Sequence, residues 1–102
     1  MKIAMDVMGG DNAPLAPIKG GVMAAKTYGE EVLLVGPEDT IRGILKEQGA
    51  ENTPGITIVH APDVVDMHDD PATVLRQKPQ SSMAVALKLV KDGQADAIVS
   101  AG

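Results

Sequence analysis

The chain has 102 residues, a net charge of −5 and no cysteine, and 44% of its residues are hydrophobic. The acidic balance argues against a protein that binds a nucleic-acid backbone, and the lack of cysteine excludes disulfides, cysteine-type zinc sites and a thiol nucleophile. Asp6 interrupts the first apolar run, and no stretch approaches the roughly 20 apolar residues that span a bilayer, so we expect a cytosolic protein without a signal peptide.

A strand at residues 3–7 is expected to lead into a loop that contains Gly9 and Gly10. The two glycines allow positive φ and close backbone approach, and Asp11 or Asn12 can cap the helix that follows. Backbone N–H groups at that helix start can hold an anion, although the charge of Asp11 repels phosphate. The glycine spacing matches neither a dinucleotide-binding nor a P-loop motif, and a tight turn with an ordinary cap is the alternative.

The helix after this loop is predicted to start near residues 14–17 and to end at Tyr28, before Gly29. Gly20 and Gly21 lie inside it, where each costs about 1 kcal/mol relative to alanine. We expect these glycines to let another backbone approach the helix closely. Because Tyr28 is the only aromatic residue, the core must consist of aliphatic side chains, methionine and alanine.

A strand at residues 32–36 and a helix at residues 38–48 follow, and Gly49 ends that helix. A third strand at residues 56–60 ends in His60. This histidine is either a general acid or base at the sheet edge or a hydrogen-bonded structural residue, and we favour the structural role.

An acidic cluster with one histidine comes next, formed by Asp66, His68, Asp69 and Asp70. Carboxylates and imidazole can coordinate divalent cations. A solvated loop that leads into a short helix, beginning at Pro71 and ending at Pro79, explains the same residues. We favour the loop and expect no metal site.

The last unit is a helix that starts at Ser81 or Ser82 and ends before Gly93, followed by a strand at residues 97–100. Arg76 and Lys78 put two cations near the start of this helix. The arrangement suits an anion pocket, and an ordinary surface helix end would look the same.

Strands and helices alternate along the whole chain, which predicts the α/β class: an open, mostly parallel sheet with helices on both faces. Continuous apolar strands support this prediction, and the ligand site is expected beyond their carboxyl ends. No repeat, linker or composition shift divides the chain. Four strands leave one sheet face or edge bare.

Three separated segments together resemble one family. They are Asp6-Val7-Met8-Gly9-Gly10-Asp11-Asn12-Ala13-Pro14, Arg76-Gln77-Lys78-Pro79-Gln80-Ser81-Ser82-Met83 and Ala95-Asp96-Ala97-Ile98-Val99-Ser100-Ala101-Gly102. In order and spacing they are similar to the bacterial phosphate acyltransferases of phospholipid synthesis. Val7 stands where the family more often has alanine.

The resemblance implies an enzyme that transfers a fatty acyl group from acyl carrier protein to inorganic phosphate and releases acyl phosphate. It also implies a homodimer without an organic cofactor and a Rossmann-like three-layer fold, similar to that of isopropylmalate dehydrogenases and phosphotransacetylases. Family members are longer and continue with Asn-Thr-Gly, so we expect residues 1–102 to be the N-terminal part of a single larger α/β domain and to be inactive alone. Any peripheral contact with a membrane is expected outside them, since no basic amphipathic helix is present.

By this resemblance, the phosphate and thioester site lies between the loop at residues 9–12 and the end of the last strand, and Asp11 and Asn12 are the best catalytic candidates. The residues expected to bind substrate or phosphate are Gly9, Gly10, Asp11, Asn12, Arg76, Lys78, Ser81, Ser82, Ser100, Ala101 and Gly102. Arg76 and Lys78 add positive charge either to this site or to a surface that docks the acidic carrier protein. Two alternatives stay open: a phosphotransacetylase-like enzyme acting on a small acyl-CoA, and a non-catalytic structural or interaction module.

Overall fold

A computed structural model describes residues 1–64, 70, 73 and 76–100 of the chain. The strands are β1 (Lys2–Asp6), β2 (Glu31–Gly36), β3 (Ile56–His60) and β4 (Ala97–Val99), and the helices are α1 (Leu15–Tyr28), α2 (Glu38–Glu47) and α4 (Ser82–Lys91). The predicted alternation of strands and helices is therefore confirmed, with small shifts at the ends of most elements.

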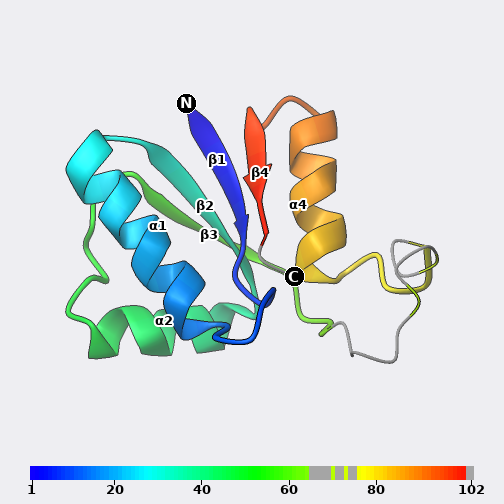
Figure 1. The fold of residues 1–102 in the computed structure, drawn as a ribbon, viewed down its shortest axis with the longest axis horizontal. Helices are drawn as coiled ribbons and strands as arrows, with labels where there is room; N and C mark the ends of the chain where they lie inside the picture. Colours follow the sequence, from blue (N-terminus) through cyan, green and yellow to red (C-terminus); the bar gives the residue numbers. More distant parts are fainter. Residues whose placement is uncertain (65–69, 71–72, 74–75, 101–102) are drawn as a thin grey trace.

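The four strands form one parallel sheet in the order β3-β2-β1-β4. β1 lies in the middle, and Ala4 pairs with Leu33 of β2 on one side and with Ile98 of β4 on the other. Because all four strands run in the same direction, their carboxyl ends meet at one edge of the sheet (Figure 1). The open parallel α/β sheet predicted from the sequence is confirmed.

The helices cover both faces of this sheet, as predicted. α1 and α2 pack on one face and α4 packs on the other, against β1, β2 and β4 (Figure 1). Successive residues of β1 point to opposite faces. Met5 packs against the core under α1 and α2, whereas Ala4 belongs to the core under α4. Both cores consist of aliphatic residues and alanine, with methionine packed at the border of the first.

Among the described helices α1, α2 and α4, the ends agree with the sequence signals at all positions but one. Gly29 and Gly49 adopt positive φ after α1 and α2, and Ser81 caps α4 by accepting a hydrogen bond from the Ala84 backbone N–H at 3.2 Å. The prediction that Asp11 or Asn12 caps α1 is wrong. Pro14 is the residue before the first helical position, and no side chain caps this helix.

The two glycines of α1 have different surroundings. A Cβ atom at Gly21 would lie 2.9 Å from Leu34 Cδ2 and 3.2 Å from Val32 Cγ1, so the missing side chain brings the helix close to the sheet. A Cβ atom at Gly20 would meet no heavy atom within 4 Å among the described residues. The expected close approach therefore occurs at Gly21, to side chains rather than to a backbone, and it is absent at Gly20.

Part of the region between β3 and α4 lies outside the described residues. This applies to Asp66, His68 and Asp69 of the acidic cluster and to residues 71, 72, 74 and 75 of the helix predicted between Pro71 and Pro79. Elsewhere, no described helix is long and apolar enough to cross a membrane.

Candidate functional site

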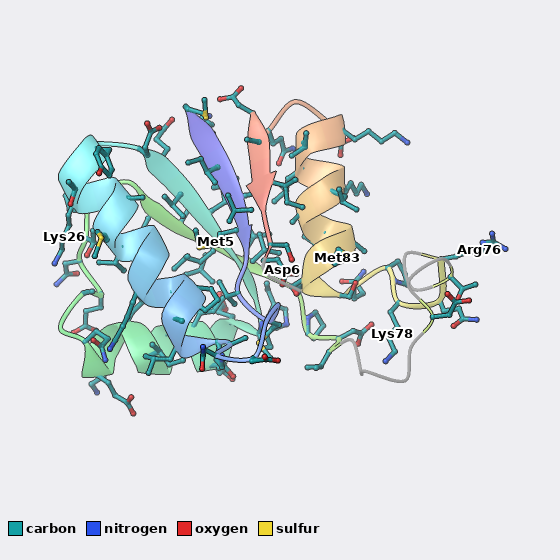
Figure 2. All side chains as sticks on the ribbon, viewed as in Figure 1. Met5, Asp6, Lys26, Arg76, Lys78 and Met83 are labelled. Atoms are coloured by element: carbon teal, nitrogen blue, oxygen red, sulfur yellow. The ribbon has the colours of Figure 1, made fainter. Side chains whose placement is uncertain are left out.

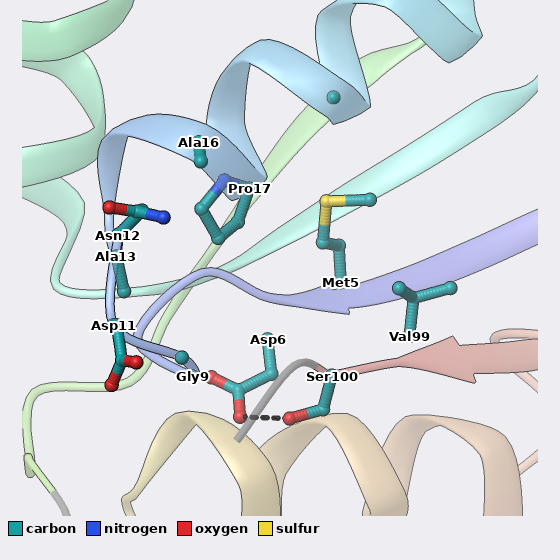
Figure 3. Close-up of a pocket in the computed structure, with 12 residues that line it drawn as sticks. Met5, Asp6, Gly9, Asp11, Asn12, Ala13, Ala16, Pro17, Val99 and Ser100 are labelled. Carbon is teal, nitrogen blue, oxygen red and sulfur yellow. Dashed lines mark hydrogen bonds between the residues drawn. The ribbon is translucent and has the colours of Figure 1, made fainter.

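A pocket of about 320 Å³ lies at the carboxyl edge of the sheet, between the β1–α1 loop, the first turns of α1 and the end of β4 (Figure 3). It joins two segments that the sequence analysis singled out, although they are about 90 residues apart. Its lining residues are Met5, Asp6, Gly9, Gly10, Asp11, Asn12, Ala13, Ala16, Pro17, Gly20, Val99 and Ser100.

The β1–α1 loop forms the polar rim of this pocket. Gly10 has a φ of 92°, a value that favours glycine, and its carbonyl accepts a hydrogen bond from the Ala13 backbone N–H at 3.4 Å. The side chains of Asp11 and Asn12 are exposed. Within the described part of the chain, the backbone N–H groups from Gly9 to Asn12 donate to no protein acceptor. A ligand that reaches these N–H groups can therefore accept hydrogen bonds from them.

Asp6 connects this loop to two other segments. It is the last residue of β1 and is 3% exposed. Its Oδ1 accepts hydrogen bonds from the Met8 backbone N–H, at 3.0 Å, and from the Ser82 hydroxyl. Its Oδ2 accepts a hydrogen bond from the Ser100 hydroxyl at 2.9 Å. A single carboxylate thus fixes the loop, the first turn of α4 and the end of β4 relative to one another.

The hydrogen bonds to Asp6 determine what two of the predicted ligands can do. A serine hydroxyl carries one proton. Ser82 and Ser100 both direct that proton to Asp6, so toward a bound ligand their oxygens act as acceptors in this arrangement. Donation from either hydroxyl to phosphate would require the bond to Asp6 to be exchanged, and the predicted phosphate contact stays a prediction.

The structure does not bring every predicted site residue to this pocket. Figure 2 shows Arg76 and Lys78 beyond the start of α4, away from Met5 and Asp6. Lys78 Nζ donates to the carbonyl oxygen of Val64 at 3.0 Å. Ser81 is fully buried, and its hydroxyl caps α4.

Ala101 and Gly102 lie outside the described residues. Arg76 and Lys78 were expected either at the phosphate site or at a surface that docks the carrier protein. Their position away from Met5 and Asp6 favours a surface outside the pocket.

The charged side chains among the described lining residues are both carboxylates, Asp6 and Asp11. An anion in the pocket would be repelled by these side chains and attracted by the backbone N–H groups of the loop. A phosphate held there therefore needs positive charge from groups outside this set.

Among the described residues, no three histidine or acidic side chains come together as a candidate metal site.

His60 has a structural contact, as favoured from the sequence. Its Nδ1 accepts a hydrogen bond from the Glu38 backbone N–H at 3.0 Å, in the first turn of α2. An N–H group of a helix start that has no partner inside the helix is thereby satisfied.

Sequence reasoning missed two parts of the site. It assigned no role to Asp6, although a carboxylate that ends an apolar strand must find donors if it is buried. It also missed the apolar half of the pocket, because Met5, Ala16 and Val99 look like ordinary core residues in sequence. Only the arrangement of β4 beside β1 leaves these residues next to an open space.

Comparison with known proteins confirms the family resemblance seen in the sequence. The family described as "Fatty acid synthesis protein" matches the chain over residues 1–102. Proteins named phosphate acyltransferase match it along its whole length, with 49% identity in Trichlorobacter lovleyi, 48% in Pelotomaculum thermopropionicum and 44% in Herpetosiphon aurantiacus. The chain spans 29%, 29% and 27% of these three relatives, respectively, so each of them is more than three times as long.

Proposed function

This chain belongs to the fatty acid synthesis protein family, and from that premise we propose that the whole protein transfers a fatty acyl group from acyl carrier protein to inorganic phosphate. The product is an acyl phosphate, which serves phospholipid synthesis. Relatives named phosphate acyltransferase support this proposal, since 44–49% identity over the chain makes a shared activity the simplest expectation.

The observation that carries the proposal is the meeting of two distant segments at one pocket. The loop from Gly9 to Asn12 supplies four N–H groups that have no acceptor among the described residues, and the end of β4 supplies Ser100. Such N–H groups are suited to an oxygen that gains negative charge during acyl transfer. In an open parallel sheet, the carboxyl edge is also where ligands bind.

The chemistry needs no nucleophile from the protein. A phosphate oxygen attacks the thioester carbonyl carbon, the carbon–sulfur bond breaks, and the carrier leaves as a thiol after taking up a proton. The site must hold phosphate and thioester in line and must stabilise the oxygen of the tetrahedral intermediate. We assign the second task to the β1–α1 loop. Positive charge for phosphate comes from residues outside the pocket lining described here.

The wider setting of the enzyme follows from the same premise. We propose that residues 1–102 are the N-terminal part of one larger α/β domain, in a cytoplasmic homodimer that uses no organic cofactor. Arg76 and Lys78, which lie away from the pocket, are proposed to contribute to the surface that docks the acidic carrier protein.

The test is an assay of the whole protein for acyl phosphate, with inorganic phosphate and either acyl carrier protein thioesters or coenzyme A thioesters of the same acyl group. We expect phosphate-dependent product, and a higher kcat/KM with the carrier protein. Preference for a short acyl-CoA would instead indicate a phosphotransacetylase-like enzyme. Absence of product with either donor would refute the proposal.

A further inference from the structure

We infer that the apolar half of the pocket, between α1 and β4, holds the fatty acyl chain of the donor and that Gly20 keeps its far end open. The inference rests on the proposed function and assigns one substrate group to one part of the site. We call this part the acyl groove and define it by Met5, Ala13, Ala16, Pro17, Gly20 and Val99.

The two halves of the pocket differ in chemistry. Figure 3 shows Met5 and Val99 rising from β1 and β4 on the side of α1, while Asp6 and Ser100 lie on the side of α4. The groove side is lined by apolar and small residues, whereas the carboxylates and the loop N–H groups form the rim. An acyl thioester has the same division, with a polar reacting end and an apolar chain.

Charge decides which part of the substrates fits the groove. Asp6 and Asp11 are the charged lining residues among those described, and both would repel a phosphate placed deep in the pocket. An alkyl chain meets no such cost and gains from leaving water.

Size also fits the assignment. A volume of about 320 Å³ lies at the lower end of the range for small-molecule sites. Gly20 lines the pocket, and a Cβ atom there would touch no described heavy atom within 4 Å. A larger side chain at this lining position causes no clash with the described residues, and we expect it to narrow the groove.

The experiment compares Gly20→Leu with Gly43→Leu in the whole protein. Gly43 is the matched control, because it is an exposed glycine inside α2, its Cβ would also meet nothing within 4 Å, and it does not line the pocket. We expect Gly20→Leu to lower kcat/KM for palmitoyl-carrier relative to hexanoyl-carrier by about 10-fold or more, as for the loss of a few methylene contacts. The KM for phosphate should stay unchanged, and Gly43→Leu should match the unmodified protein.

A binding measurement separates this inference from the proposed function. A neutral, dansyl-labelled long-chain alkyl amide is titrated into the same three proteins and followed by fluorescence. If the protein makes no acyl phosphate but Gly20→Leu alone weakens binding of the probe, the groove assignment stands and the function falls. If Gly20→Leu leaves both chain-length preference and probe binding unchanged, the groove assignment is wrong. A fall in Tm for Gly20→Leu alone would also overturn it, since it would show that another part of the protein fills the groove.

Discussion

Asp6 is the residue on which the geometry of the pocket depends. Burial of a carboxylate is unfavourable unless donors replace its water, and here three donors come from three different segments. Its charge also lies beside the N-terminus of α4, where the helix dipole favours an anion. The bonds to Ser82 and Ser100 span 76 and 94 residues of sequence, so Asp6 constrains the end of β4 much more than a local turn could.

We expect Asp6→Asn to lower the free energy of unfolding by about 2 kcal/mol, because an amide nitrogen replaces an oxygen that accepts a charge-assisted bond. Ser82→Ala and Ser100→Ala should each cost about 1 kcal/mol, and their effects should be much smaller once Asp6 is already Asn. Urea unfolding of the whole protein measures these values. Asp92→Asn, at an exposed residue after α4, is the control and should change stability by less than about 0.5 kcal/mol. Equal stability of Asp6→Asn and the control would remove Asp6 from this role.

At this scale the sequence predicted which loops matter but not how they are connected. The glycines of the β1–α1 loop and the position of Ser100 at a strand end were visible as patterns of residue type. The bonds from Ser82 and Ser100 to Asp6 were not visible in the sequence, because hydrogen bonds between segments this far apart depend on which strands are neighbours. That order, with β4 beside β1, follows from the packing of the whole sheet.

Among the elements, α4 shows how two adjacent serines can have different tasks. Ser81 is fully buried and caps the helix, whereas the next residue, Ser82, donates to Asp6. Sequence analysis treated both as candidate phosphate ligands. A serine at a helix start is itself the ordinary cap, and only the structure separates capping from contact with the site.

We expect Ser81→Ala to lower the free energy of unfolding by about 1 kcal/mol, since one backbone N–H of α4 loses its acceptor. Ser81→Gly should lower the free energy of unfolding by only a few tenths of a kcal/mol, because glycine is tolerated at the N-cap position. Chemical unfolding of the two variants in the whole protein gives the comparison. Substrate KM values should not move in either variant. A rise in the KM for phosphate with unchanged stability would mean that Ser81 binds substrate instead.

The elements themselves were predictable because their signals are local. Short apolar runs gave the strands, and glycines with positive φ ended α1 and α2 where expected. The cap of α1 was predicted wrongly, since both Asp11 and Asn12 are good capping residues in sequence. In the structure Pro14 precedes the helix, and the two polar side chains remain at the pocket rim.

For the molecule as a whole, the parallel sheet brings the ends of four strands to one edge, and the strand order decides which ends share a pocket. β1 and β4 are neighbours, so the β1–α1 loop faces Ser100. His60, at the far strand β3, is occupied by its bond to α2 and takes no part in this pocket. The strand order therefore brings the ends of β1 and β4, and not the end of β3, to one pocket.

The rate of acyl phosphate formation by the whole protein carrying Asn12→Ala tests the central claim most directly. Asn12 lines the pocket with an exposed side chain, and Asn52→Ala, at an exposed asparagine in the loop before β3, is the matched control. If the side-chain amide of Asn12 acts together with the N–H groups of the β1–α1 loop on the reacting centre, Asn12→Ala should lower kcat by about 100-fold with little change in Tm, while Asn52→Ala stays at the level of the unmodified protein. Equal rates for the two variants would contradict the assignment of acyl transfer to this pocket.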